Sequence, residues 1–190
     1  MITALATRIT EALCASSTIE ESDKELYQYG FFLLLSHIFF LLLTALVGVW
    51  FQVPVESILF YIMFSLVRSY AGGIHAKTES VCILLTSFAI FISIAGMYLM
   101  KVVESIFTPL GMLLVGVTSI LALCPLDTQE KPLSNEERKY YRQASWISVI
   151  GIVALAMMGI ALQYYGVLYA ASFTVALEGS LLFLGRKGNN

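Results

Sequence analysis

The sequence predicts an all-α membrane protein: a polytopic bundle of about six transmembrane helices, preceded by an amphipathic helix at the membrane surface. Hydrophobic residues make up 58% of the chain, and only 13% of its residues are charged. A soluble domain carries about 25% charged residues, and a chain of 190 residues has too little polar surface here to cover a soluble core. Long apolar stretches recur along the chain, and its cationic residues gather on one side of them. We expect residues 1–190 to form a single membrane-embedded domain.

A helix needs about 20 apolar residues to cross the hydrocarbon of a bilayer. Stretches of this kind occur at residues 30–50, 53–70, 80–100, 105–123, 145–163 and 166–185. Backbone groups cannot stay unpaired in lipid, so each stretch is predicted to be an α-helix. Most connections between them are short, whereas segments 71–79 and 124–144 are longer and polar.

The cationic residues predict the orientation. Every Lys and Arg except Lys101 falls on one side of the six-span arrangement. Because cytoplasmic loops carry the excess of Lys and Arg, we expect both termini and both longer loops to be cytoplasmic. Glu56 lies near the opposite boundary of the second span, where we expect it to be hydrated.

Residues 1–26 differ from the spans. Apolar residues recur there near helical spacing, at Ile2, Leu5, Ile9, Ala12 and Leu13. This pattern predicts an amphipathic helix, which either lies on the inner leaflet or packs across the cytoplasmic ends of the bundle.

The richest polar cluster runs from Arg68 to Cys82, across segment 71–79. The pair Gly72-Gly73 can adopt positive φ and let the backbone approach another group closely. Cys82 falls in the first turn of the third span, where the positive end of the helix dipole stabilises a thiolate. His75 is its candidate partner, because an imidazole in contact with a thiol gives an activated nucleophile.

Spacing limits this interpretation. In one continuous helix, His75 and Cys82 would stand about 10.5 Å apart along the axis, which is too far for a hydrogen bond. We therefore expect His75 to lie in a non-helical loop that folds back over the start of the helix. The alternative is that Cys82 is a small core residue and His75 a solvated loop residue.

Other polar residues support less specific predictions. The segment from Cys124 to Leu133 is stiffened by Pro125 and Pro132, and Ser134 to Glu137 predict a helix cap before the fifth span. Glu178 is an ionisable group inside the sixth span, which by default indicates a functional role: it either orients His75 or pairs with Arg68. His37 is expected to bond a neighbouring helix.

Several classes of function are disfavoured. Three cysteines without a CxxC motif argue against a disulfide scaffold and a dithiol enzyme. Two histidines on different elements are weak metal ligands, so we expect neither a metal nor another cofactor. The sequence lacks the basic stripe that would indicate binding to nucleic acid.

The ordered motifs resemble those of the AgrB family, bacterial membrane peptidases that mature the precursor of a cyclic quorum-sensing peptide. The resemblance covers essentially the whole chain. It is carried by Arg68-x-x-x-Gly72-Gly73-x-His75-Ala76 followed by Cys82, and by Cys124-Pro125-x-Asp127-x-x-x-Lys131-Pro132-Leu133. Glu130 departs from the pattern, because the family commonly has Asn there.

The resemblance implies that Cys82 is the nucleophile and His75 the base of a cysteine endopeptidase in the bacterial cell membrane. It implies that Arg68, Gly72 and Gly73 support the site, and that Asp127, Lys131 and Pro132 help to engage an AgrD-like precursor. Ser80 is a candidate to stabilise the oxyanion, and Glu178 a further supporting residue. A homodimer in contact with membrane lipids is expected by analogy. The competing hypothesis is a small membrane transporter or exporter without peptidase activity, for which the interfacial position of the polar cluster is atypical.

Overall fold

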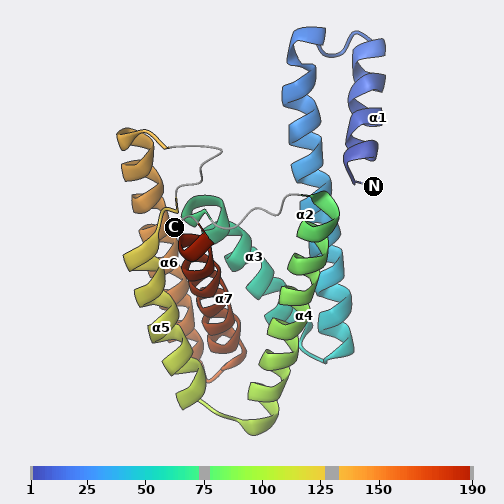
Figure 1. Cartoon of the computed structure of the whole chain (residues 1–190). Coiled ribbons are helices and arrows are strands. Elements are labelled where there is room, and N and C mark those ends of the chain that lie inside the picture. Colours follow the sequence, from blue (N-terminus) through green and yellow to red (C-terminus); the bar gives the residue numbers. More distant parts are fainter. Residues whose placement is uncertain (1, 73–77, 127–132, 189–190) are drawn as a thin grey trace. The chain divides into compact units, whose positions relative to one another are not determined.

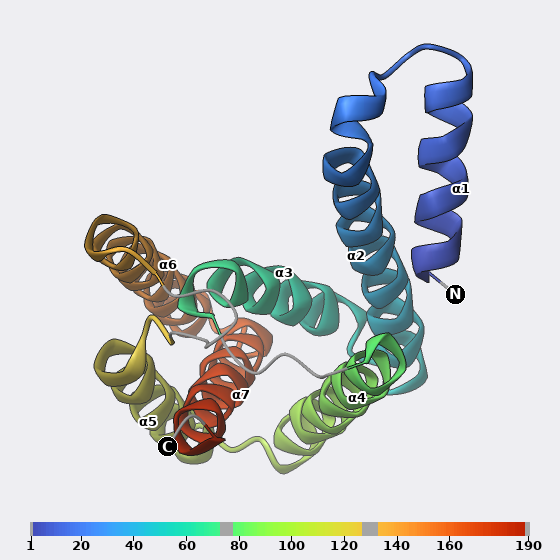
Figure 2. The same ribbon diagram turned by 45° about the horizontal axis from the view of Figure 1, so that its top comes forward.

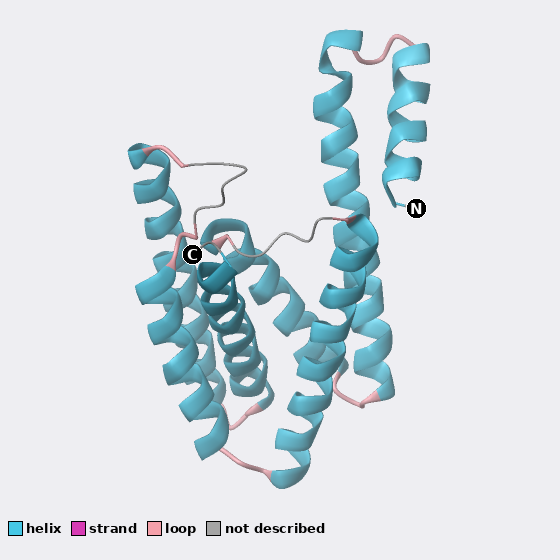
Figure 3. Ribbon diagram, viewed as in Figure 1, coloured by secondary structure: helices cyan, strands magenta, loops and turns pink. Residues whose placement is uncertain are grey.

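The computed structural model describes residues 2–72, 78–126 and 133–188, in which every regular element is helical. Figures 1 and 3 show the arrangement of these helices, with no strand in the described part of the chain. The helices are α1 (Ile2–Ala15), η1 (Glu21–Asp23), α2 (Lys24–Trp50), α3 (Pro54–Ala71), α4 (Glu79–Val103), α5 (Phe107–Leu123), α6 (Asn135–Ala161) and α7 (Gly166–Gly188). Each of the six predicted spans corresponds to one helix from α2 to α7.

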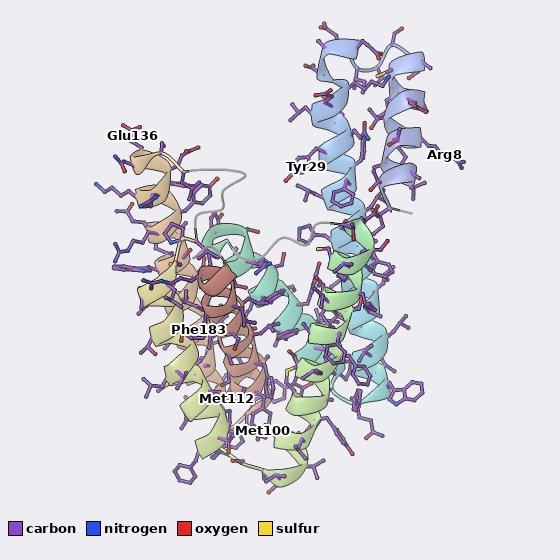
Figure 4. All side chains as sticks on the ribbon, viewed as in Figure 1. Arg8, Tyr29, Met100, Met112, Glu136 and Phe183 are labelled. Carbon is purple, nitrogen blue, oxygen red and sulfur yellow. The ribbon has the colours of Figure 1, made fainter. Side chains whose placement is uncertain are left out.

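Four helices are long and apolar enough to cross a membrane by length and composition: Glu21–Trp50, Glu79–Val103, Asn135–Ala161 and Gly166–Arg186. The helix Phe107–Leu123 is apolar but shorter. Large apolar side chains cover the outer faces of these helices; Phe183, labelled in Figure 4, is 61% exposed. Lipid is the solvent that such faces require. The prediction of an all-α membrane protein is confirmed.

Residues 1–43 form one compact unit, which holds α1 and the first part of α2. The α1 helix buries Ile2, Ala6 and Thr10, residues four apart that share one face, while Leu5 is 49% exposed. The Nε2 group of Gln28 donates a hydrogen bond of 2.9 Å to the Thr7 hydroxyl, which links α1 to α2. The helix predicted for the N-terminal segment is therefore present, but its buried face differs from the predicted one, because Leu5 and Ala12 are exposed and Thr10 is buried.

Residues 44–190 form the second unit, in which α7 is the central helix. Figure 2 shows α7 among α3, α4, α5 and α6, and α7 packs against all four. Two glycines let α5 and α7 approach closely. A Cβ on Gly116 would lie 2.5 Å from the backbone carbon of Val175, and a Cβ on Gly179 would lie 3.0 Å from the Ser119 Cβ. Small residues at such crossings allow backbones to meet in membrane helices.

The helices of this second unit alternate in direction, so their connections fall at two ends (Figure 1). At one end lie three short turns, and each contains a non-glycine residue with left-handed backbone: Gln52 (φ 57°), Glu104 (φ 54°) and Gln163 (φ 57°). At the other end lie the C-terminal ends of α3, α5 and α7 and the N-terminal ends of α4 and α6. The described motif residues, among them Arg68, Gly72 and Cys82, belong to this second end, which we call the motif end.

Candidate functional site

The Cys82 thiol stands in the first turn of α4, as the sequence predicted. Thr78 takes the N-cap position with extended backbone (φ −135°, ψ 147°), and its side chain makes no capping hydrogen bond. The Cys82 N–H donates to the Thr78 carbonyl at 3.1 Å, which closes the first turn of the helix. Cys82 is a free, half-buried thiol, and Ser80 lies exposed two residues before it. The start of a helix offers outward-pointing N–H groups and a positive dipole end, both of which favour an anion near this thiol.

Several predicted site residues lie outside the described residues. These are Gly73, His75, Asp127, Lys131 and Pro132. The pairing of Cys82 with His75 therefore stays a prediction from the sequence.

A buried ion pair connects α3 and α7 at the motif end. Arg68 Nη1 lies 3.7 Å from Glu178 Oε1, and the side chain of Glu178 is 0% exposed against 27% for Arg68. The sequence left two roles open for Glu178, and the geometry joins it to Arg68. Burying a carboxylate is costly unless a cation compensates it, so Glu178 holds the guanidinium at the protein-facing side of α3.

The same guanidinium reaches Gly72, the last described residue before the segment that carries His75. Arg68 Nη1 donates to the Gly72 carbonyl at 3.4 Å. Gly72 has φ 77° and ψ −161°, a backbone conformation that is essentially restricted to glycine. The chain of contacts therefore runs from the buried Glu178, through Arg68, to the loop that carries His75.

The two motif-bearing loops meet at this point. The Leu126 N–H donates to the Ala71 carbonyl at 3.0 Å, so the segment after α5 is bonded to the end of α3. A Cβ on Gly72 would stand 3.0 Å from the Leu126 carbonyl oxygen, which explains why the contact needs a glycine. Sequence reasoning missed Leu126, because its role is a backbone contact that leaves no mark on residue type.

Cys124 is a structural cysteine in this arrangement. It is 6% exposed, follows α5 directly and is joined to Pro125 by a cis peptide bond. Burial raises the pKa of the Cys124 thiol, while Ser145 and Arg142 oppose that effect. A buried thiol with a raised pKa is a poor nucleophile, which argues against a catalytic role for Cys124.

Comparison with known families shows which family the chain belongs to. The AgrB family (Accessory gene regulator B) matches residues 6–182. The chain belongs to the AgrB family. It is similar to two proteins of Clostridium perfringens described as AgrB-like, one from strain SM101 (Type A) and one from strain 13 (Type A). Each is 26% identical over 175 residues, which cover 86% of this chain and 79% of the relative. No solved structure matches.

Membership of this family supports a role for the chain in the accessory gene regulator system, in the processing of a quorum-sensing peptide. Both motif segments fall inside the matched range. Within the described residues, the fold brings Arg68, Gly72 and Glu178 into one connected cluster, and it places Ser80 and Cys82 on a separate element, the start of α4.

The start of α6 shows the predicted cap. Ser134 accepts from the Glu137 N–H at 3.2 Å, and Glu137 Oε2 accepts from the Ser134 N–H at 2.9 Å, which is a capping box. The cap extends α6 back to Asn135, ten residues before the span predicted to begin at 145. Figure 4 shows Glu136 at this exposed tip of α6. Farther along, the Arg142 guanidinium stacks 4.9 Å above the Trp146 ring.

The prediction for Glu56 was wrong. Glu56 is only 5% exposed; its Oε1 lies 3.8 Å from Lys101 Nζ and accepts from the Tyr164 hydroxyl at 3.4 Å. Its partners come from the C-terminal end of α4 and from the turn between α6 and α7, about 45 and 108 residues away in the chain, which no local pattern could reveal.

Proposed function

We propose that this protein is a membrane cysteine endopeptidase that removes the C-terminal tail of an AgrD-like precursor peptide and allows the remainder to cyclise as a thiolactone. One observation supports the proposal above the others. The two loops that carry the family motifs are bonded to each other next to the Arg68–Glu178 pair, at the end of the helices where the Cys82 thiol stands at a helix start.

Cys82 is proposed as the nucleophile and His75 as its base. The first turn of α4 favours the thiolate, because the helix dipole is positive there. The backbone N–H groups of this turn, with Ser80, are the candidate donors to the oxyanion. Arg68 and Glu178 are proposed as positioning residues, which act on the catalytic loop through the Gly72 carbonyl rather than on the substrate.

The first step transfers the acyl group to the enzyme. The Cys82 sulfur forms a bond to the carbonyl carbon that follows the future ring, and the C–N bond of that peptide breaks. The thiol proton passes through His75 to the departing amine, and the C-terminal fragment leaves. The product is a thioester between the N-terminal part of the precursor and Cys82.

The second step closes the ring. A thiol of the bound peptide attacks the thioester, its proton returns through His75 to the Cys82 sulfur, and the enzyme is regenerated. One thioester replaces another, so the exchange is nearly isoenergetic and needs no ATP. Exclusion of water from the site favours cyclisation over hydrolysis.

We also propose that the motif end faces the cytoplasm, with both chain termini on that side. The proposal rests on the positive-inside rule, because every Lys and Arg except Lys101 falls on one side of the six-span arrangement predicted from the sequence. Asp127, Lys131 and Pro132, followed by the charged tip of α6, would then offer the precursor a polar docking surface at the inner leaflet.

The test is precursor cleavage in liposomes, followed by intact mass. Wild-type protein is expected to release a C-terminal fragment and to carry a mass adduct that maps to Cys82. Cys82→Ala and His75→Ala should lose both signals, while Cys82→Ser should lose the thioester adduct.

Cys124→Ala is the matched control, because this cysteine is buried and its thiol pKa is raised. It should retain cleavage after correction for the amount of folded protein. Cleavage that survives Cys82→Ala would overturn the proposed mechanism.

A further inference from the structure

A cavity of about 670 Å³ lies at the end of the second unit opposite the motif end. It is formed where the three short turns between α2 and α3, α4 and α5, and α6 and α7 converge. Small-molecule sites commonly occupy about 300–1,000 Å³ and combine apolar walls with a few convergent polar groups. The polar and aromatic groups here include Gln52, Glu56, Lys101, Glu104, Tyr164 and Tyr169.

Glu56 supplies a buried carboxylate to this cavity. Its side chain is 7% exposed, and a Cβ placed on Gly166 would stand 2.7 Å from Glu56 Oε1, so the carboxylate lies against the start of α7. The Tyr164 hydroxyl reaches it at 3.4 Å. A hydroxyl bonded well to a carboxylate approaches to about 2.5–2.7 Å, so this bond is weak. A carboxylate has about four acceptor sites, which leaves Glu56 with unused capacity for a donor.

Lys101 places a cation in this cavity, held by one hydrogen bond and one longer ionic contact. Its Nζ donates to the Gln52 carbonyl at 3.0 Å and lies 3.8 Å from Glu56 Oε1, too far for a hydrogen bond. Half of the Lys101 side chain is exposed to solvent. An incoming ammonium can therefore displace it from Glu56, because the Lys101 side chain is free to move out into water while keeping its charge hydrated.

The remaining lining selects for a cation. Glu56 and Glu104 give the cavity one more acid than base, since Lys101 is its single cationic lining residue among those described. Burial and the neighbouring Glu56 carboxylate raise the pKa of Tyr164, which keeps this residue a neutral phenol at physiological pH. Tyrosine rings attract ammonium groups through their negative faces, most strongly where water is excluded.

We propose that this cavity binds an organic ammonium group, with Glu56 as its counter-ion, tyrosine rings on its walls and Lys101 as the cation it displaces. The ligand class is a primary amine on an apolar body. Such a group belongs either to a soluble amine or peptide N-terminus, or to the ethanolamine headgroup of a lipid. The site is separate from Cys82 and does not depend on the proposed peptidase activity.

Binding is tested with the full chain in nanodiscs made only of phosphatidylcholine. Phenethylammonium is the probe, and calorimetric titration measures its affinity. Glu56→Gln should weaken binding roughly tenfold or more, because a charge-assisted bond becomes a neutral one. Lys101→Met should tighten binding severalfold, because the competing cation is gone. Glu20→Gln, a change at an exposed acid in the N-terminal unit, is the matched control and should leave the affinity unchanged.

Tyr164→Leu provides a second route to the answer in case Glu56→Gln fails to fold. It removes the ring and the hydroxyl from an exposed turn and should weaken binding several-fold. In a purely structural ion pair, loss of either partner would change the probe affinity in the same direction. The opposite changes in affinity expected for Glu56→Gln and Lys101→Met therefore distinguish a ligand site from such a pair. Absence of wild-type binding at millimolar probe would overturn the proposal, as would equal affinity in Glu56→Gln or weaker binding in Lys101→Met.

A second arm identifies the source of the ammonium. Nanodiscs that contain phosphatidylethanolamine are compared with those of phosphatidylcholine alone. A loss of probe affinity in the presence of ethanolamine lipid, abolished by Glu56→Gln, supports a lipid headgroup as the ligand. Unchanged affinity supports a soluble amine.

Discussion

The Arg68–Glu178 pair offers the sharpest test of how the motif end is held together. Replacing Arg68 by Met removes the guanidinium but keeps most of the side-chain volume. It leaves Glu178, which is 0% exposed, without the cation 3.7 Å away. The partner change is Glu178→Leu, and the double variant Arg68→Met/Glu178→Leu replaces the pair by two apolar residues.

The expected loss of stability in Arg68→Met follows from the distance between the two charged groups and from the burial of their side chains. Two unit charges at 3.7 Å attract each other by about 4 kcal/mol at an effective dielectric constant of about 20. Removing one partner of a buried pair typically costs about 3–5 kcal/mol, because the other charge is left uncompensated. Arg68 is 27% exposed, and solvent screening places the expected cost of Arg68→Met near the lower end of that range, at about 3 kcal/mol. The double variant should unfold within about 1 kcal/mol of wild type, because apolar replacement of a buried pair is often neutral or better.

Stability and activity should then separate. Unfolding is measured by titrating dodecylmaltoside micelles with sodium dodecyl sulfate, and activity by precursor cleavage under the same lipid conditions. The double variant should recover stability but not cleavage, because the donor to the Gly72 carbonyl is still missing. Arg68→Lys keeps the positive charge but not the planar guanidinium fork. Its stability and its cleavage rate should fall between those of wild type and those of Arg68→Met.

Two results would refute this reasoning. If Arg68→Met and the double variant were equally unstable, the charge of Glu178 would carry no penalty. If the double variant cleaved the precursor at the wild-type rate, Arg68 would serve only to compensate Glu178 and would have no role in positioning the loop.

Three further predictions concern single residues. Gly116→Ala should lower the free energy of unfolding by about 1–3 kcal/mol, because its Cβ would stand 2.5 Å from the Val175 backbone. Gly111→Ala on the same helix meets nothing within 4 Å and should raise the free energy of unfolding by up to about 1 kcal/mol. Equal effects of the two changes in the unfolding titration would contradict the close packing of α5 against α7. Ser134→Ala should cost about 1 kcal/mol through loss of the capping bond, visible as faster proteolysis or hydrogen exchange at the start of α6 while the rest of the helix is unchanged. Gly72→Ala should cost about 1–3 kcal/mol and abolish cleavage, because φ 77° with ψ −161° excludes a side chain; a fully active variant would show that this backbone conformation is dispensable.

Much of the fold could be predicted from the sequence, because the bilayer imposes a simple rule. Apolar length determines where each helix begins and ends, and α3, α5 and α7 begin or end within two or three residues of their predicted limits. The largest difference is at α6, where charged residues between Asn135 and Ala144 continue the helix beyond any apolar stretch. The cap at Ser134 and Glu137 was predictable, since it depends on residues three apart.

The site was only partly predictable, because its contacts connect distant parts of the chain. Residue type marked Arg68 and Glu178 as significant, but their pairing depends on how α3 packs against α7. The Leu126 contact with Ala71 uses only backbone atoms and has no pattern in the sequence. Glu56 was misjudged for a similar reason. Its position near a span boundary predicted water, whereas the end of α4 and the turn between α6 and α7 supply its partners.

The central position of α7 has a consequence for how the protein is made. This helix follows α3, α4, α5 and α6 in the chain, so it leaves the ribosome after the four helices that pack around it. Until it inserts, the faces that meet it have only lipid or one another as neighbours, and Arg68 has no Glu178 beside it. Completion of the motif end therefore has to wait for the synthesis and insertion of α7. A nascent chain arrested before α7 would present an unfinished core to the proteases that survey the membrane.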